Sequence, residues 1–190
     1  NIEIHDSWKA ESIGNLIEPK GIAVGVMYPG QHTNDGIPLI KSGDISDGKI
    51  NENMKSRISK DVNDNYSRTQ LLGGELLVVL VGNPGLSVVV PKHLKGWNVA
   101  RAVSVLKLKN KENAQFVSYA LQSREVRHNL LSYCNTTVQI TLNLKELKEV
   151  FIPWPSKPER QEIVRTLDSF NTKIELLQAQ NKTLETMAQT

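Results

Sequence analysis

The end of this sequence carries the feature that most constrains its fold, a long run of apolar side chains at helical spacing. From residue 159 onward neither glycine nor proline interrupts it. The spacings alternate between four and three residues, the heptad pattern of a helix that packs along a second helix. Such a helix would be about 50 Å long at 1.5 Å per residue, more than one compact domain can cover. We therefore expect a coiled-coil helix that pairs through the following seam: Ile163, Leu167, Phe170, Ile174, Leu177, Asn181, Leu184 and Ala188.

Two details concern how this helix begins and what interrupts its seam. Ser156 and Glu159 have the S-x-x-E spacing of a capping box, and Pro158 falls in the first turn, where its missing N–H leaves no hydrogen bond unmade. Asn181 is the polar member of the seam. Buried there it would fix the register or the number of partners, and exposed it would be an ordinary residue near a helix end. A helix folded back onto its own domain is the alternative to pairing.

The rest of the chain suffices for one domain with a hydrophobic core, which we place at 1–155, before the helix at 156–190. The helix is neutral, with five basic and five acidic residues, so the domain keeps 18 basic against 15 acidic residues. This excess allows a phosphate-facing side but is far smaller than that of a general nucleic-acid binder. Cys134 is the only cysteine, which excludes an intrachain disulfide and favours a cytoplasmic location. The longest apolar run, Leu76 to Val81, is too short to cross a membrane.

The composition and periodicity of the domain predict a mixture of strands and helices. Dense β-branched residues predict strands at 75–81, 86–90 and 102–108. Asn83-Pro84-Gly85 would form the turn of a hairpin between the first two. A shorter strand is expected at 37–40, where Pro38 favours a sheet edge or a strand start. Because 111–134 and 144–150 have helical periodicity, we expect a compact α+β domain with a mostly antiparallel sheet and flanking helices.

The sequence lacks the motifs that would mark it as an enzyme. It contains no P-loop, no G-x-G-x-x-G and no G-x-S-x-G nucleophile elbow. The four histidines are scattered without a second ligand at helical spacing, so we expect no metal site. Asn83-Pro84-Gly85 is similar to the Asn-Pro-Pro-aromatic motif of amino-methyltransferases but lacks the second proline and the aromatic, and no Gly-rich loop for S-adenosylmethionine precedes it. We therefore expect a non-catalytic chain, with Cys134 as a core thiol.

Several segments, taken in order, resemble the specificity (S) subunit of type I restriction-modification systems. Glu75 stands where that family has Asp, and Arg160 stands where it has Gln. Together the segments cover nearly the whole chain. They are Gly36-Ile37-Pro38-Leu39-Ile40-Lys41-Ser42-Gly43-Asp44-Ile45, Leu72-Gly73-Gly74-Glu75-Leu76-Leu77, Asn98-Val99-Ala100-Arg101, and Ile152-Pro153-Trp154-Pro155 followed by Glu159 and Gln161-Glu162-Ile163-Val164.

The resemblance implies a DNA target-recognition domain followed by one conserved helix. In that family a complete subunit carries two such domains, each recognising half of a split DNA site, and their two helices lie antiparallel as a spacer. Methylation and cleavage belong to the modification (M) and restriction (R) subunits, so S-adenosylmethionine is expected on the M subunit and no cofactor on this chain. The implied partners are double-stranded DNA, the M subunits, the R subunit and a second helix, which includes self-association. The chain, which opens at Asn1 rather than Met, would be the first half, the second half or a natural half-length form of such a subunit.

Polar loops of the domain are the candidates for DNA contact, because side chains recognise base edges in a groove while phosphate contacts set position. Asn and Gln suit adenine, and Lys and Arg suit guanine or phosphate. Each candidate could equally be a solvated loop residue, and Arg101 could instead anchor the strand that follows it. The candidates are Lys41, Ser42, Lys92, His93, Lys95, Asn98, Arg101, Asn135, Thr136, Thr137 and Gln139.

Two other functions stay open at the level of the sequence. The chain could be an interaction scaffold whose coiled coil joins domains without a DNA role. It could also be a small-molecule enzyme with Asn83-Pro84 or Cys134 at its site. Sequence-specific retention of duplex DNA that weakens steeply with salt separates DNA recognition from both.

Overall fold

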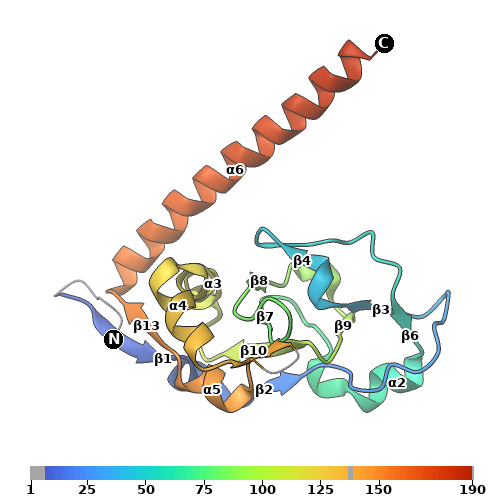
Figure 1. Cartoon of the computed structure of the whole chain (residues 1–190), viewed down its shortest axis with the longest axis horizontal. Helices are drawn as coiled ribbons and strands as arrows, with labels where there is room; N and C mark the ends of the chain where they lie inside the picture. The colour runs from blue at the N-terminus through green and yellow to red at the C-terminus, as the bar shows by residue number, and fades with distance from the viewer. Residues whose placement is uncertain (1–6, 137–138, 190) are drawn as a thin grey trace. The chain divides into compact units, whose positions relative to one another are not determined.

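The computed structural model describes residues 7–136 and 139–189 of the chain. The chain divides into two compact units, Asn1–Trp154 and Pro155–Thr190, which are described in turn. The first unit has the predicted α+β character with mainly antiparallel sheets, and the second is a single helix (Figure 1). Among the helices in the described ranges, none combines the length and apolar character that a membrane span requires.

A four-stranded antiparallel sheet forms the centre of the first unit. Its strands, in spatial order, are β2 (Ile17–Val24), β10 (Val103–Leu108), β7 (Leu76–Val79) and β8 (Ser87–Val89). The hairpin predicted at Asn83-Pro84-Gly85 is confirmed, since β7 and β8 pair with Leu76 opposite Val89. Gly85 has a φ of +87°, a left-handed conformation that glycine adopts without steric cost.

Helices cover one face of this sheet. The helical character predicted at 111–134 is confirmed over most of the range, but the structure divides it into a 3-10 turn, η4 (Lys111–Asn113), and two helices, α3 (Ala114–Gln122) and α4 (Arg124–Ser132). The break lies at Ser123, whose backbone is extended and whose hydroxyl donates to the Ala120 carbonyl at 2.8 Å. A serine side chain that bonds the preceding turn competes with the helix ladder, which helical periodicity does not reveal.

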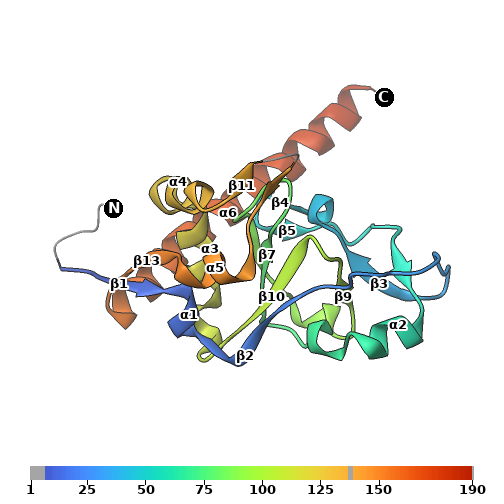
Figure 2. The ribbon, with the colours of Figure 1, turned by 60° about the horizontal axis from the view of Figure 1, so that its bottom comes forward.

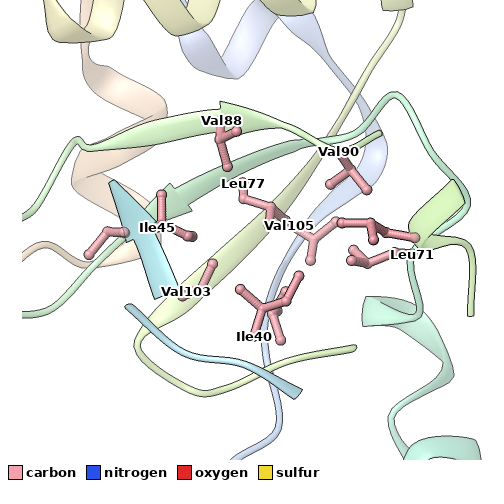
Figure 3. Close-up of a cluster of buried hydrophobic side chains, with 11 residues drawn as sticks. Ile40, Ile45, Leu71, Leu77, Val88, Val90, Val103 and Val105 are labelled. Atoms are coloured by element: carbon pink, nitrogen blue, oxygen red, sulfur yellow. The ribbon is translucent and has the colours of Figure 1, made fainter. Parts of the chain in front are cut away.

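A second layer covers the other face. It contains a three-stranded sheet in the order β6 (Arg57–Ile58), β3 (Ile37–Ile40) and β9 (Asn98–Val99), with α2 (Lys60–Asn65) and the 3-10 turn η2 (Ser67–Thr69). Both ribbon views place β3, β9 and α2 on the opposite side of β7 from α3 and α4 (Figures 1 and 2). Ile40, Ile45 and Leu71 of this layer gather around Leu77 and Val105 of the central sheet (Figure 3). These aliphatic contacts form the main core that joins the two layers.

Strand β3 lies between its two neighbours, and Pro38 is accommodated at its start. Pro38 pairs only with Arg57 of β6, and the parallel pairing with β9 begins one residue later, at Leu39. A proline cannot donate to a sheet ladder, so it is tolerated where one side of the strand is free. Of the two alternatives predicted for Pro38, the strand start is the one observed.

Short elements complete the first unit. β1 (Lys9–Ser12) pairs antiparallel with β13 (Phe151–Trp154), so the two ends of the unit lie side by side. The helix predicted at 144–150 is confirmed as α5 (Leu144–Glu149). The remaining elements are α1 (Ile13–Leu16), the 3-10 turns η1 (Ser42–Asp44) and η3 (Lys92–Leu94), and the hairpins of β4 (Ile45–Ser46) with β5 (Lys49–Ile50) and of β11 (Asn135–Thr136) with β12 (Ile140–Thr141).

The second unit is α6 (Lys157–Ala188), a helix of 32 residues. It begins as predicted, since the Glu159 carboxylate accepts the Ser156 N–H at 2.9 Å and the Ser156 hydroxyl at 2.6 Å. The seam leaves large apolar side chains in water, with Phe170 and Leu184 each 62% exposed. Such a stripe would bury its apolar surface only by pairing.

Glu75 is the buried charge on which the start of β7 depends. It is 2% exposed, and its carboxylate accepts the N–H groups of Leu72 and Gly73 at 2.9 and 2.8 Å. We predict that Glu75→Ala lowers the free energy of unfolding by about 1–3 kcal/mol, because the N–H groups of Leu72 and Gly73 lose the acceptor that fixes the start of β7. Urea denaturation measures the change. Glu18→Ala, at an exposed position, is the control and should change the value by less than about 0.5 kcal/mol. Equal stability of the two variants would contradict the assignment.

Candidate nucleic-acid interface

Three segments that are distant in sequence meet at the turn between β9 and β10. The Ala100 N–H donates to the Ile40 carbonyl at 2.8 Å, and the Arg101 N–H donates to the Val26 carbonyl at 3.0 Å. The Ile40 carbonyl belongs to the peptide bond with Lys41, and the Val26 carbonyl belongs to the peptide bond with Met27. Lys41 and Met27 therefore lie on segments that flank the Ala100–Arg101 turn. We call residues 26–28, 40–42 and 100–101 the cationic junction.

A close approach of backbones makes this junction possible. A Cβ on Gly25 would lie 2.2 Å from the Val99 carbonyl oxygen and 2.6 Å from that of Ala100, so only glycine fits there. The Gly25 N–H donates to the Val103 carbonyl at 3.0 Å. The segment that leaves β2 is therefore pinned against the β9–β10 turn before it enters the loop to β3 (Figure 2).

The junction presents two exposed cations. Lys41 and Arg101 are both exposed, and Ser42 is half-buried at the start of η1. The Asp44 carboxylate accepts the Lys41 N–H at 2.8 Å and so fixes the loop after β3. The sequence-predicted residues Lys41, Ser42 and Arg101 are thus brought together by the fold.

The predicted polar patch lies at the same end of the central sheet. The Leu80 N–H donates to the Ala102 carbonyl at 2.8 Å, and the Leu142 N–H donates to the Leu80 carbonyl at 2.9 Å. Gln139, which is exposed, leads into this row of backbone hydrogen bonds. Asn135 and Thr136 form β11 of the adjacent hairpin, while Thr137 lies outside the described residues.

The predicted basic loop lies at the other end of β7. The Gly74 N–H, before β7, donates to the Val90 carbonyl at 2.8 Å, and Lys92, His93 and Lys95 follow directly. About seven residues of extended chain, on the order of 20 Å, separate this end of β7 from the junction. His93 Nε2 lies 2.8 Å from Glu52 Oε1, so an acidic side chain already partners this loop. The candidates therefore form two groups and not one continuous site.

Asn98 is not available for the predicted DNA contact, because its side chain is completely buried. Its side-chain amide donates to Asn63 Oδ1 at 2.9 Å, and its Oδ1 accepts the Thr69 hydroxyl at 2.7 Å. A polar side chain inside a domain is stabilised by such partners and has no access to a ligand. Asn98 joins β9 to α2 and η2, so its role is structural.

The residues considered for catalysis are engaged structurally. Asn83 lies in the β7–β8 turn, and its Oδ1 accepts a hydrogen bond from Arg127 of α4. Burial, together with the nearby Glu146 carboxylate, raises the pKa of the Cys134 thiol, which disfavours the reactive thiolate. Within residues 7–136 and 139–189, no group of three His, Cys, Asp or Glu side chains could hold a metal ion.

Two apolar residues of the junction were missed by the sequence interpretation. Met27 is 43% exposed and Tyr28 is 79% exposed. The available signal was an apolar–aromatic pair directly before the turn residues Pro29 and Gly30. Met27 and Tyr28 lie next to Arg101 because the Arg101 N–H donates to the carbonyl of Val26, the residue before them. The spacing of residues along the sequence does not predict this hydrogen bond.

Comparison with known proteins assigns the family. The profile of the family described as "Type I restriction modification DNA specificity domain" matches residues 24–186, which include most of both units. The chain belongs to this family. A curated relative of this specificity-domain chain is the specificity subunit of the type I restriction enzyme EcoBI from Escherichia coli, which is 33% identical over 169 residues. The match covers 88% of the chain but 35% of that subunit.

Solved structures share the fold of this specificity-domain chain. The S subunit from M. genitalium has a TM-score of 0.61 at 20% identity, with 94% of this chain and 42% of that chain covered. The HsdS subunit from Thermoanaerobacter tengcongensis has a TM-score of 0.61 at 19% identity, with 92% and 40% covered. In both cases the chain spans less than half of its structural neighbour.

We predict that Asn98→Ala lowers the free energy of unfolding by about 1–3 kcal/mol, because buried partners are left unsatisfied. DNA affinity measured on the folded fraction should not change. Urea denaturation and a binding titration test the two statements, with the exposed Asn34→Ala as the stability control. Lost DNA affinity at unchanged stability would restore Asn98 as a contact residue.

Proposed function

We propose that this chain is a DNA target-recognition unit that reads one half of a split site for a type I restriction-modification complex. The observation that carries the proposal is the family match over residues 24–186, which covers most of the domain and most of the helix together. The chain would supply recognition only. Methyl transfer, with S-adenosylmethionine, and cleavage would belong to the M and R subunits that it joins in the cytoplasm.

The cationic junction supports this function physically. Lys41 and Arg101 are exposed on neighbouring segments that backbone hydrogen bonds hold in place. Such cations neutralise phosphates, and an arginine can also donate two hydrogen bonds to guanine. A rigid support matters because the geometry of base recognition is lost when the donor moves. We therefore assign the junction, with the neighbouring Gln139 hairpin, as the principal DNA-contacting surface.

The basic loop at 92–95 is a secondary candidate. Glu52 accompanies His93 there, which weakens the local positive potential. The loop also lies at the opposite end of β7 from Arg101. We assign this loop to phosphate contact, without a part in base recognition.

Helix α6 supports the second part of the proposal, which concerns spacing. Most of its seam residues are apolar, and those from Phe170 onward are exposed. The helix carries five basic and five acidic residues, so no net charge opposes pairing. We propose that α6 pairs with a second helix of the same kind, supplied by a second copy or by another half of a longer subunit. The length of the pair would then set the distance between two recognition domains.

The DNA-binding proposal predicts different effects for the two junction cations. Arg101→Gln should weaken binding of a selected duplex by about 1–3 kcal/mol and relax the preferred base pair. Lys41→Gln should weaken all duplexes equally and reduce the slope of log affinity against log salt by about 1. The duplexes are selected from a pool with a randomised centre by the full chain, alone and with an M subunit. Fluorescence anisotropy at several salt concentrations gives both quantities.

Lys60→Gln is the matched control, because Lys60 is exposed on α2 and already pairs with Asp64. Its affinity should equal that of the unchanged chain. Lys95→Gln tests the second group, and a reduced salt slope without altered base preference is expected. Failure of the unchanged chain to select any duplex, alone or with an M subunit, would refute DNA recognition and leave the scaffold function.

The pairing proposal predicts that Leu177→Lys abolishes self-association of the full chain. Placing a charge in the seam should weaken the pair by at least about 100-fold, since both copies lose a buried leucine. Thr172→Lys changes the opposite face of α6 and is the control. Sedimentation velocity over a range of concentrations measures the result. A monomeric unchanged chain, or equal behaviour of the two variants, would contradict pairing through this seam.

A further inference from the structure

Met27 and Tyr28 form an exposed apolar pair at the start of the loop between β2 and β3. Tyr28 is 79% exposed, so its ring contributes almost nothing to the hydrophobic core. The aromatic ring lies in water within a loop that is otherwise polar and turn-forming. This surface gains free energy only when another molecule covers it.

Met27 and Tyr28 directly follow a rigid part of the backbone. Val26, directly before it, is 1% exposed and packs with Leu39 and Ile58. The Val26 N–H donates to the Val99 carbonyl at 2.7 Å, and the Val26 carbonyl accepts the Arg101 N–H at 3.0 Å. The backbone is therefore fixed on the side of β9, one residue before Met27.

The backbone is also restricted immediately after the pair. Pro29 has a fixed φ, and Gly30 follows with a φ of +69°. Tyr28 is thus held between a backbone that is fixed at Val26 and a proline. An aromatic ring carried on so short a tether loses little conformational entropy when it binds.

The neighbours of the pair determine what kind of molecule would cover it. Lys41 and Arg101 adjoin it through the hydrogen bonds of the junction, and both are exposed cations. A polyanion would be held there by its phosphates, which brings its uncharged parts onto the apolar pair. In duplex DNA these parts are the base edges and the thymine methyl groups.

We propose that Met27 and Tyr28 make an apolar contact to a base of the recognised half-site, beside a phosphate held by Lys41 and a base pair recognised by Arg101. This inference rests on the proposed DNA-recognition function. The Tyr28 ring covers the edge of a base or a thymine methyl and so adds sequence discrimination to that of Arg101. Because the contact carries no charge, it releases no counterions, and its contribution to affinity is independent of salt.

The experiment compares Tyr28→Ala with Lys41→Gln and the unchanged full chain on two probes. One probe is the selected duplex described above, and the other has a scrambled centre of the same length. For Tyr28→Ala we expect affinity for the selected duplex to fall about tenfold while the salt slope stays unchanged, and the preference over the scrambled duplex to narrow. Tyr28→Phe, which keeps the ring, should bind as the unchanged chain does.

Phe151→Ala is the matched control, because Phe151 is also an exposed aromatic residue but lies on β13. It should bind both probes normally. Urea denaturation of each variant checks the fold, and Tyr28→Ala should unfold at the same denaturant concentration as the unchanged chain because the ring is not in the core.

Several results would overturn the inference. They are unchanged affinity of Tyr28→Ala, an equal loss of affinity on both probes, or a salt slope that falls as in Lys41→Gln. Unchanged DNA affinity with lost binding of an M subunit would also overturn it, because the pair would then be a protein contact. In each of these cases the selected duplex still binds the unchanged chain, so the proposed function stands. Absence of any selected duplex would overturn both proposals together.

Discussion

Two backbone hydrogen bonds at the turn between β9 and β10 fix how three segments of the domain meet, beside the aliphatic core that joins its two layers. Ala100 donates to Ile40 of the three-stranded sheet, and Arg101 donates to Val26 at the end of the segment from β2. Because β9 belongs to the smaller sheet and β10 to the larger one, this turn is shared by both. Gly25 allows the backbones to approach closely enough for the bonds to form. The position of every residue in the cationic junction depends on this contact.

The β9–β10 turn also determines which polar residues are buried and which are exposed to a ligand. Asn98, two residues before the turn, is fully buried and bonded to Asn63 and Thr69. Arg101, one residue after Ala100, is exposed. A modest net charge is therefore sufficient for DNA binding if the cations are concentrated where the chain is rigid. Specificity would come from a base contact of Arg101 and from the uncharged neighbours of the cations, because phosphate contacts are the same for every sequence.

The two units divide two physical tasks. The first buries an aliphatic core between two layers and leaves polar loops at the ends of its central sheet. The second places most of its apolar residues along one seam of a helix, and the seam side chains from Phe170 onward are exposed. A seam of this kind gains stability only from a second helix. In the proposed function, recognition and spacing are therefore carried by different parts of the chain.

Local patterns in the sequence determined α6, its capped start and the β7–β8 hairpin. Heptad spacing, the Ser156–Glu159 pair and Asn83-Pro84-Gly85 each act within a few residues, so spacing alone predicts them. The family could also be predicted from the sequence, because the segments that resemble it follow one another along the chain.

Tertiary structure decided which polar residues share a surface. Asn98 became buried, the loop at 92–95 was placed away from Arg101, and Met27 and Tyr28 came beside it. These outcomes depend on hydrogen bonds and packing between residues far apart in the chain, as from Arg101 to Val26 and from Ala100 to Ile40. The periodicity of nearby residues does not predict such long-range pairings.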